Sequence, residues 1–103
     1  MSVVVVAIQT PKPGRLQDVL DAFEVITPLV HKEQGCELYA VHTDGEAVYI
    51  IERWSSQEDL DLHAAGEPLV RLDELRGDAL AIPVAVHVMS NLPYGEPLLG
   101  TIQ

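Results

Sequence analysis

The chain has 103 residues, which is the usual length of a single domain. With 48% hydrophobic and 21% charged residues it is too apolar to be disordered, yet no apolar run approaches the roughly 18 residues of a membrane-spanning helix. Sixteen acidic residues against six basic ones give a formal net charge of -10, which argues against nucleic acid and anionic membranes as partners.

The N-terminal residues and the single cysteine bear on cellular location, disulfide formation and metal binding. Residues 1–9 lack the basic segment and the cleavage site of a secretory signal, so we expect a cytoplasmic location. Cys36 is the only cysteine, so no internal disulfide can form. Structural zinc sites need several Cys or His ligands close in sequence, so we expect no metal.

The first half of the chain predicts a strand, a helix and a hairpin. Residues 3–8 form a β-branched run that ends before Pro11. From residue 16 apolar side chains recur at helical spacing as far as residue 30, and Pro28 should kink this helix or allow only a short final turn. Residues 36–43 and 48–54 read as two strands, because Asp44 and Gly45 between them suit a tight turn.

The second half predicts two short helices and a last strand. Ser55 can cap a helix that runs through His63, with Glu58 completing the capping box. Pro68 suits the first turn of a further helix that includes Arg76, and residues 84–89 predict a fourth strand. This order of elements is the split βαβ arrangement of a ferredoxin-like α+β fold with an antiparallel sheet.

Apolar residues occur on both faces of the predicted sheet. Residues 3–6 are four consecutive valines, and residues 48–51 are almost as apolar. Side chains alternate between the faces of a strand, so both faces should be buried, whereas helices can cover only one. We therefore expect a homodimer that pairs through its sheet faces. The alternative is that the valines reflect β-propensity and leave one apolar face in water.

Three segments resemble the antibiotic biosynthesis monooxygenase family, whose members form dimeric α/β barrels. They are PKPGR at residues 11–15, GCELY at 35–39 and ERWSSQEDLDLH at 52–63. The positions in family order are Gly14, Gly35, Cys36, Tyr39, Trp54 and His63. The resemblance covers a domain of residues 1–91 and leaves a leucine-containing tail, residues 92–103, that we expect to dock, with the partner subunit as one place for it.

Within the family the chain is most similar to cofactor-free enzymes that oxidise aromatic polyketide phenols to quinones. The resemblance implies a monooxygenase that takes a small aromatic phenol or quinol and molecular oxygen and needs no metal or flavin. It also implies a set of catalytic residues, namely His63, Trp54 and Arg76. Ala7 falls near the place where the haem-degrading branch has an asparagine, so haem cleavage is rejected.

The remaining candidates are expected to bind substrate. Tyr39 could donate a hydrogen bond to a bound carbonyl, and the strand histidines His42 and His87 could bond inside a pocket or simply fill inner sheet positions. Ile50 and Leu60 stand where the quinone-forming enzymes have an asparagine and a tyrosine. A non-catalytic binding protein of the same fold, and a cyclase or isomerase, therefore stay open as alternatives.

Each residue also has a purely structural interpretation. A histidine titrates near neutral pH and suits a base for a phenolic proton, but His63 could equally cap or pack a helix. Glu52, Arg53 and Trp54 do not form one cluster, because adjacent strand residues face opposite ways, so the pattern assigns no role to Glu52. The acidic residues of the two later helices, Asp59 among them, are expected to be a solvated surface.

Overall fold

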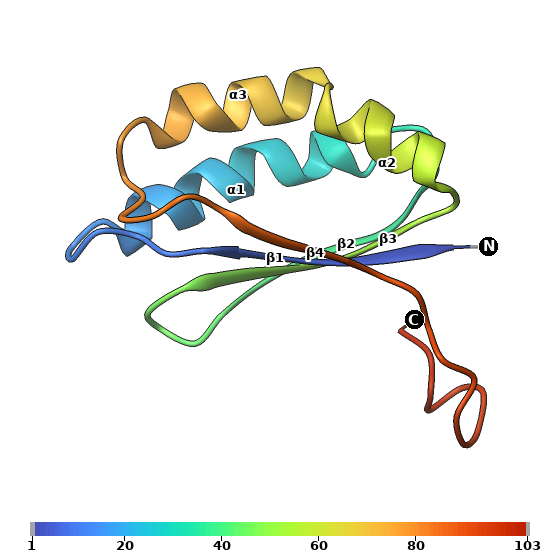
Figure 1. The fold of residues 1–103 in the computed structure, drawn as a ribbon. Helices are drawn as coiled ribbons and strands as arrows, with labels where there is room; N and C mark the ends of the chain where they lie inside the picture. The colour runs from blue at the N-terminus through green and yellow to red at the C-terminus, as the bar shows by residue number, and fades with distance from the viewer. Residues whose placement is uncertain (1, 103) are drawn as a thin grey trace.

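The computed structural model describes residues 2–102 and has a single antiparallel sheet with all its helices on one face (Figure 1). The elements in chain order are β1 (Val3–Gln9), α1 (Leu16–Val30), β2 (Cys36–Thr43), β3 (Val48–Trp54), α2 (Gln57–Ala64), α3 (Glu67–Arg76) and β4 (Ala85–Met89). The four strands lie in the order β2-β3-β1-β4. This is the ferredoxin-like α+β arrangement, so the predicted fold class is confirmed.

Helix α1 packs the centre of the core against the sheet. Its buried residues recur at the spacing of one helical face: Val19, Ala22, Phe23, Ile26 and Val30. The helix continues for two residues beyond Pro28, as a short final turn. Thr27 Oγ1 donates to the carbonyl of Phe23 at 2.6 Å just before that proline. The sequence therefore predicted both the helix and its weakened end.

The hairpin between β2 and β3 is also confirmed. The Asp44 carboxylate accepts hydrogen bonds from the amides of Glu46 at 2.9 Å and Ala47 at 2.8 Å. Gly45 has φ 91°, a conformation that residues with a Cβ rarely adopt. The turn sets the register in which Val48 pairs with Thr43 and Ile50 pairs with Val41.

The start of α2 differs from the prediction. Its N-cap is Ser56, whose hydroxyl accepts the amide of Asp59 at 3.1 Å, and not Ser55. Ser55 instead donates its hydroxyl to the Asp59 carboxylate, which also accepts from Gln34 Nε2 at 2.8 Å. Asp59 is therefore buried, and the prediction that it belongs to a solvated acidic surface is wrong. These bonds lower the pKa of Asp59, Ser55 having the largest effect.

The sheet has two faces of different character. Val5, Ala7 and Gln9 of β1 point toward the helices, whereas Val6 and Ile8 point to the other face. Figure 1 shows the C-terminal segment leaving β4 on the side of the sheet away from the helices. Arg53 Nη1, on β3, donates to the Ile102 carbonyl of that segment at 2.8 Å. Within residues 2–102, no helix is long and apolar enough to cross a membrane.

Candidate active site

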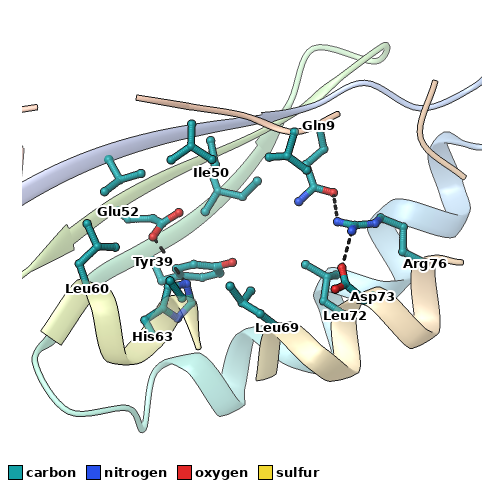
Figure 2. A pocket seen from close by; sticks show the side chains of 15 residues that line it. Gln9, Tyr39, Ile50, Glu52, Leu60, His63, Leu69, Leu72, Asp73 and Arg76 are labelled. Atoms are coloured by element: carbon teal, nitrogen blue, oxygen red, sulfur yellow. Dashed lines mark hydrogen bonds and ion pairs between the residues drawn. The ribbon is translucent and has the colours of Figure 1, made fainter. Parts of the chain in front are cut away.

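A cavity of about 300 Å³ lies between the sheet and helices α2 and α3 (Figure 2). Its wall is mostly aliphatic, which suits a flat hydrophobic ligand. The aliphatic side chains come from β1, β3, both helices, β4 and the residue before β4: Val5, Ala7, Ile50, Leu60, Leu69, Leu72, Val84 and Val86. Polar side chains interrupt this wall at two separated places, with His63 at one and Arg76 at the other (Figure 2).

The His63 end is built around a buried imidazole. His63 is 4% exposed, and its ring stacks on the Trp54 indole with centroids 4.4 Å apart. The Tyr39 ring meets its edge at 5.5 Å. His63 Nδ1 lies 2.6 Å from the Glu33 carboxylate, which comes from the turn between α1 and β2. The two rings and the carboxylate therefore fix the orientation of the imidazole, and its Nε2 faces β3.

Glu52 is the group that Nε2 faces. Its carboxylate Oε1 lies 3.8 Å from His63 Nε2 and accepts the indole N–H of Trp54 at 2.9 Å. Glu52 is 4% exposed, and this burial raises the pKa of its carboxyl because the charged form loses hydration. The Trp54 hydrogen bond and His63 oppose the shift, while the charge of Glu33 adds to it.

Tyr39 places a phenol at the same end. It is 5% exposed, and Figure 2 shows its side chain at the cavity beside His63. Burial is the main reason that the pKa of Tyr39 is strongly raised, and the charges of Glu52 and Glu33 raise it further. The hydroxyl therefore keeps its proton at neutral pH and can donate a hydrogen bond to a ligand oxygen.

At the other end of the cavity, the last turn of α3 places the positively charged guanidinium of Arg76. Arg76 Nη1 donates to Gln9 Oε1 at 2.7 Å, and Nη2 donates to the Asp73 carboxylate at 2.5 Å. The Arg76 side chain is 12% exposed, whereas the Asp73 side chain is 72% exposed. Among the described residues, Arg76 Nε is buried and has no hydrogen-bond partner. A ligand oxygen here would meet a guanidinium that only partly uses its donors.

The eight predicted site residues fall into three groups. The structure brings five of them together around the cavity: Tyr39, Ile50, Leu60, His63 and Arg76. Trp54 is fully buried behind the His63 ring and supports it without lining the cavity. His42 and His87 are exposed and pair with Tyr49 and Val6, on the face of the sheet opposite the helices. They therefore do not join His63 at this cavity.

Two polar residues of the site, Gln9 and Glu33, were not singled out from the sequence, and Glu52 was considered but given no role. Gln9 and Glu52 sit on strands at the inward positions, two residues from Ala7 and from Trp54. A polar residue at an inward position is the signal that could have revealed them. Residues 52 and 54 share a face, so Glu52 and Trp54 do form a cluster, and only Arg53 points away. Glu33 lies in a turn and had no such signal.

Across residues 2–102, no group of three or more His, Cys, Asp or Glu side chains is arranged to hold a metal ion. The one cysteine, Cys36, is partly buried, and burial raises the pKa of its thiol.

Comparison with known proteins identifies the family. Residues 1–71 match the family described as antibiotic biosynthesis monooxygenase. The Escherichia coli K12 protein named "Probable quinol monooxygenase YgiN" is 31% identical over 100 residues, covering 84% of this chain and 95% of that protein. The chain therefore belongs to the antibiotic biosynthesis monooxygenase family.

Solved structures agree on the fold. Rv0793 from Mycobacterium tuberculosis superposes with a TM-score of 0.82 at 26% identity, over 93% of this chain and 100% of that one. PA3566 from Pseudomonas aeruginosa gives a TM-score of 0.80 at 22% identity, over 88% of this chain and 94% of that one.

Proposed function

We propose that the protein is a cofactor-independent monooxygenase that oxidises a hydrophobic aromatic phenol or quinol to a quinone in the cavity between sheet and helices. The observation that carries this proposal is the pairing of a buried, carboxylate-held imidazole with a mostly aliphatic cavity. Family membership and the quinol named for the E. coli relative support it. The cavity volume of about 300 Å³ lies at the lower end for small-molecule sites, so a compact ring system fits best.

The chemistry starts with removal of a phenolic proton. His63 accepts that proton at Nε2, and the Glu33 carboxylate stabilises the imidazolium that forms. The phenolate is electron-rich and can pass electrons to oxygen in a cavity that excludes water. A phenol loses its O–H hydrogen and the hydrogen of the reacting ring carbon. One oxygen atom of O2 enters at that carbon to give the quinone, or a hydroxyquinone from a quinol, and the other leaves as water with these two hydrogens. Molecular oxygen is therefore the only oxidant needed.

Two further donors, one at each end of the cavity, orient the ring. The Tyr39 hydroxyl and the Arg76 guanidinium can hold an oxygen of the substrate, which would otherwise lose its hydration in an aliphatic cavity. Ile50 and Leu60 pack against the ring faces. In this scheme Trp54 acts through His63 and Glu52, as their support.

We also propose that the protein works as a homodimer through the sheet face opposite the helices. This face carries the half-buried aliphatic residues Val6, Ile8 and Ile51 on neighbouring strands. The C-terminal segment beyond β4 has Leu92, Leu98 and Leu99 largely exposed, which favours their docking on a second subunit. A monomeric mass by light scattering at micromolar concentration would contradict this proposal.

Oxygen uptake tests the activity. The protein, stripped of metal by a chelator, is mixed with a tricyclic anthrone, and oxygen consumption is followed for the wild type, His63→Ala and Arg76→Ala. We expect uptake that survives chelation and falls in both variants. Arg71→Ala is the matched control, because Arg71 is exposed on the same helix as Arg76. Tight binding of the anthrone without uptake would instead favour the non-catalytic binding protein.

A further inference from the structure

Two carboxylates flank one imidazole at the His63 end of the cavity. Glu33 contacts Nδ1 of His63 at 2.6 Å, and Glu52 lies 3.8 Å from Nε2 on the other side of the ring. The two carboxylates differ in burial, since the side chain of Glu52 is 6% exposed and that of Glu33 is 18% exposed. The ring therefore connects a carboxylate on the cavity wall with one nearer the surface.

The Glu33 carboxylate is closely packed by the residues around it. Gly66 is the N-cap residue of α3, and a Cβ at that position would lie 2.7 Å from Glu33 Oε2. The missing side chain thus leaves room for the Glu33 carboxylate beside α2. Trp54 stacks on the imidazole and bonds to Glu52, so it fixes the spacing between the ring and the second carboxylate.

The geometry points to Glu52 as a further catalytic residue, which stores the substrate's proton inside the site while oxygen reacts. This inference rests on the proposed function. The phenolic O–H bond breaks and its proton goes to His63 Nε2. The new N–H then gives the proton to Glu52 Oε1, so that a neutral carboxylic acid and a neutral imidazole remain beside the phenolate. Glu33 acts as a positioning residue for Nδ1.

Burial favours a proton on the Glu52 carboxyl. A buried carboxyl favours its neutral form, and the raised pKa of Glu52 has burial as its largest cause. The Glu33 side chain is 18% exposed and lies on the opposite side of the ring, against Nδ1. When one oxygen atom leaves as water, the acid returns its proton to that oxygen and Glu52 is again a carboxylate. The proton balance closes within the cavity, without exchange with solvent.

The test uses 4-nitrophenol, a phenol whose absorbance reports ionisation, in the absence of oxygen. Binding is followed at a pH below the pKa of free 4-nitrophenol, with a pH-indicator dye in weak buffer and with infrared difference spectra of protein labelled with ¹³C-glutamate. In the wild type we expect bound phenolate, no proton release to the dye, and a new ¹³C-shifted band of a protonated carboxylic acid. Because this readout needs no oxygen chemistry, it separates failure of the proton store from failure of the monooxygenase.

The matched variants are Glu52→Gln and Glu24→Gln. Gln keeps the size of Glu52 and can still accept the Trp54 indole hydrogen, and Glu24 is an exposed residue of α1. We expect Glu52→Gln to lose the acid band and most of the bound phenolate, and Glu24→Gln to behave as the wild type. Proton release to the dye in the wild type, an acid band already present before the phenol is added, or a band that survives in Glu52→Gln would each overturn the inference. The wild-type spectra decide the matter even if Glu52→Gln folds poorly.

Discussion

The two polar ends of the cavity are built in different ways. At the His63 end, a turn, two strands and α2 contribute side chains that are buried and in mutual contact. At the Arg76 end, the guanidinium is held by Gln9 and by Asp73, whose own side chain is mostly in solvent. A buried network resists rearrangement, whereas a partly solvated contact adapts at little cost. We infer that the His63 end fixes the chemistry and that the Arg76 end adjusts to the substrate.

Removing Trp54 should have the largest effect, because it takes away the support of the His63 end. Trp54→Ala leaves a cavity and an unpaired Glu52 carboxylate, and we expect it to cost about 3–5 kcal/mol of unfolding free energy. Urea denaturation followed by circular dichroism measures the loss. Tyr94→Ala is the control, since Tyr94 is 74% exposed and its loss should change stability by less than about 0.5 kcal/mol.

Substitutions at the Arg76 end should mainly affect substrate use. Arg76→Ala removes a charged donor, and hydrogen bonds to charged groups contribute about 1.5–3 kcal/mol, so we expect kcat/KM to fall about tenfold to a hundredfold. Arg76→Lys keeps the charge and should restore part of kcat/KM. The extent of this recovery should differ between substrates whose oxygen at the Arg76 end is placed differently. Equal recovery for all substrates would contradict the adjustable role of this end.

The burial of Glu52 predicts a pH-dependent stability. Its folded-state pKa is raised, so the folded protein binds this proton more tightly than the unfolded chain. Stability should fall as pH rises from the ordinary glutamate pKa through the raised value. Glu52→Gln removes this loss. In urea unfolding at several pH values, the unfolding free energy of the variant relative to that of the wild type should therefore increase as the pH rises. Acids with lowered pKa values, such as Asp44 and Asp78, are common to both proteins and cancel.

The comparison between these pH curves depends on the groups around Glu52. His63 and Trp54 oppose its raised pKa, and Glu33 adds to it. In addition to burial, the charge of Glu52 raises the pKa of Tyr39 and the pKa of Cys36. Parallel curves for the wild type and Glu52→Gln would mean that Glu52 carries no burial penalty in the folded protein.

The smallest effect is expected for His42. Its ring lies outside the cavity on an exposed strand position, so His42→Ala should leave the KM for an anthrone or quinol unchanged within about twofold. Steady-state oxygen uptake measures this. A large rise in KM would mean that His42 reaches a substrate site which the described chain alone does not form.

The sequence predicted the fold well because each element had a local physical signal. The spacing of Phe23 and Ile26 predicted α1, the Asp44–Gly45 pair predicted the hairpin, and Pro68 predicted the start of α3. The cap of α2 was displaced by one residue, because Ser55 and Ser56 are equally good caps in isolation. Only the contact of Ser55 with Asp59 separates the two.

The site was predicted less completely, and the difference has a physical reason. Residue type and family resemblance pointed to His63 and Arg76, and both side chains line the cavity. The partners Glu33 and Glu52 are 30 and 11 residues away from His63 along the chain, and glutamate is common on surfaces. Which of the sixteen acidic residues is desolvated beside the imidazole was decided by the packing of a turn, a strand and α2 against each other. Secondary-structure propensity depends on neighbouring residues and can therefore be predicted along the sequence. Desolvation of a side chain depends instead on which distant groups the fold brings together.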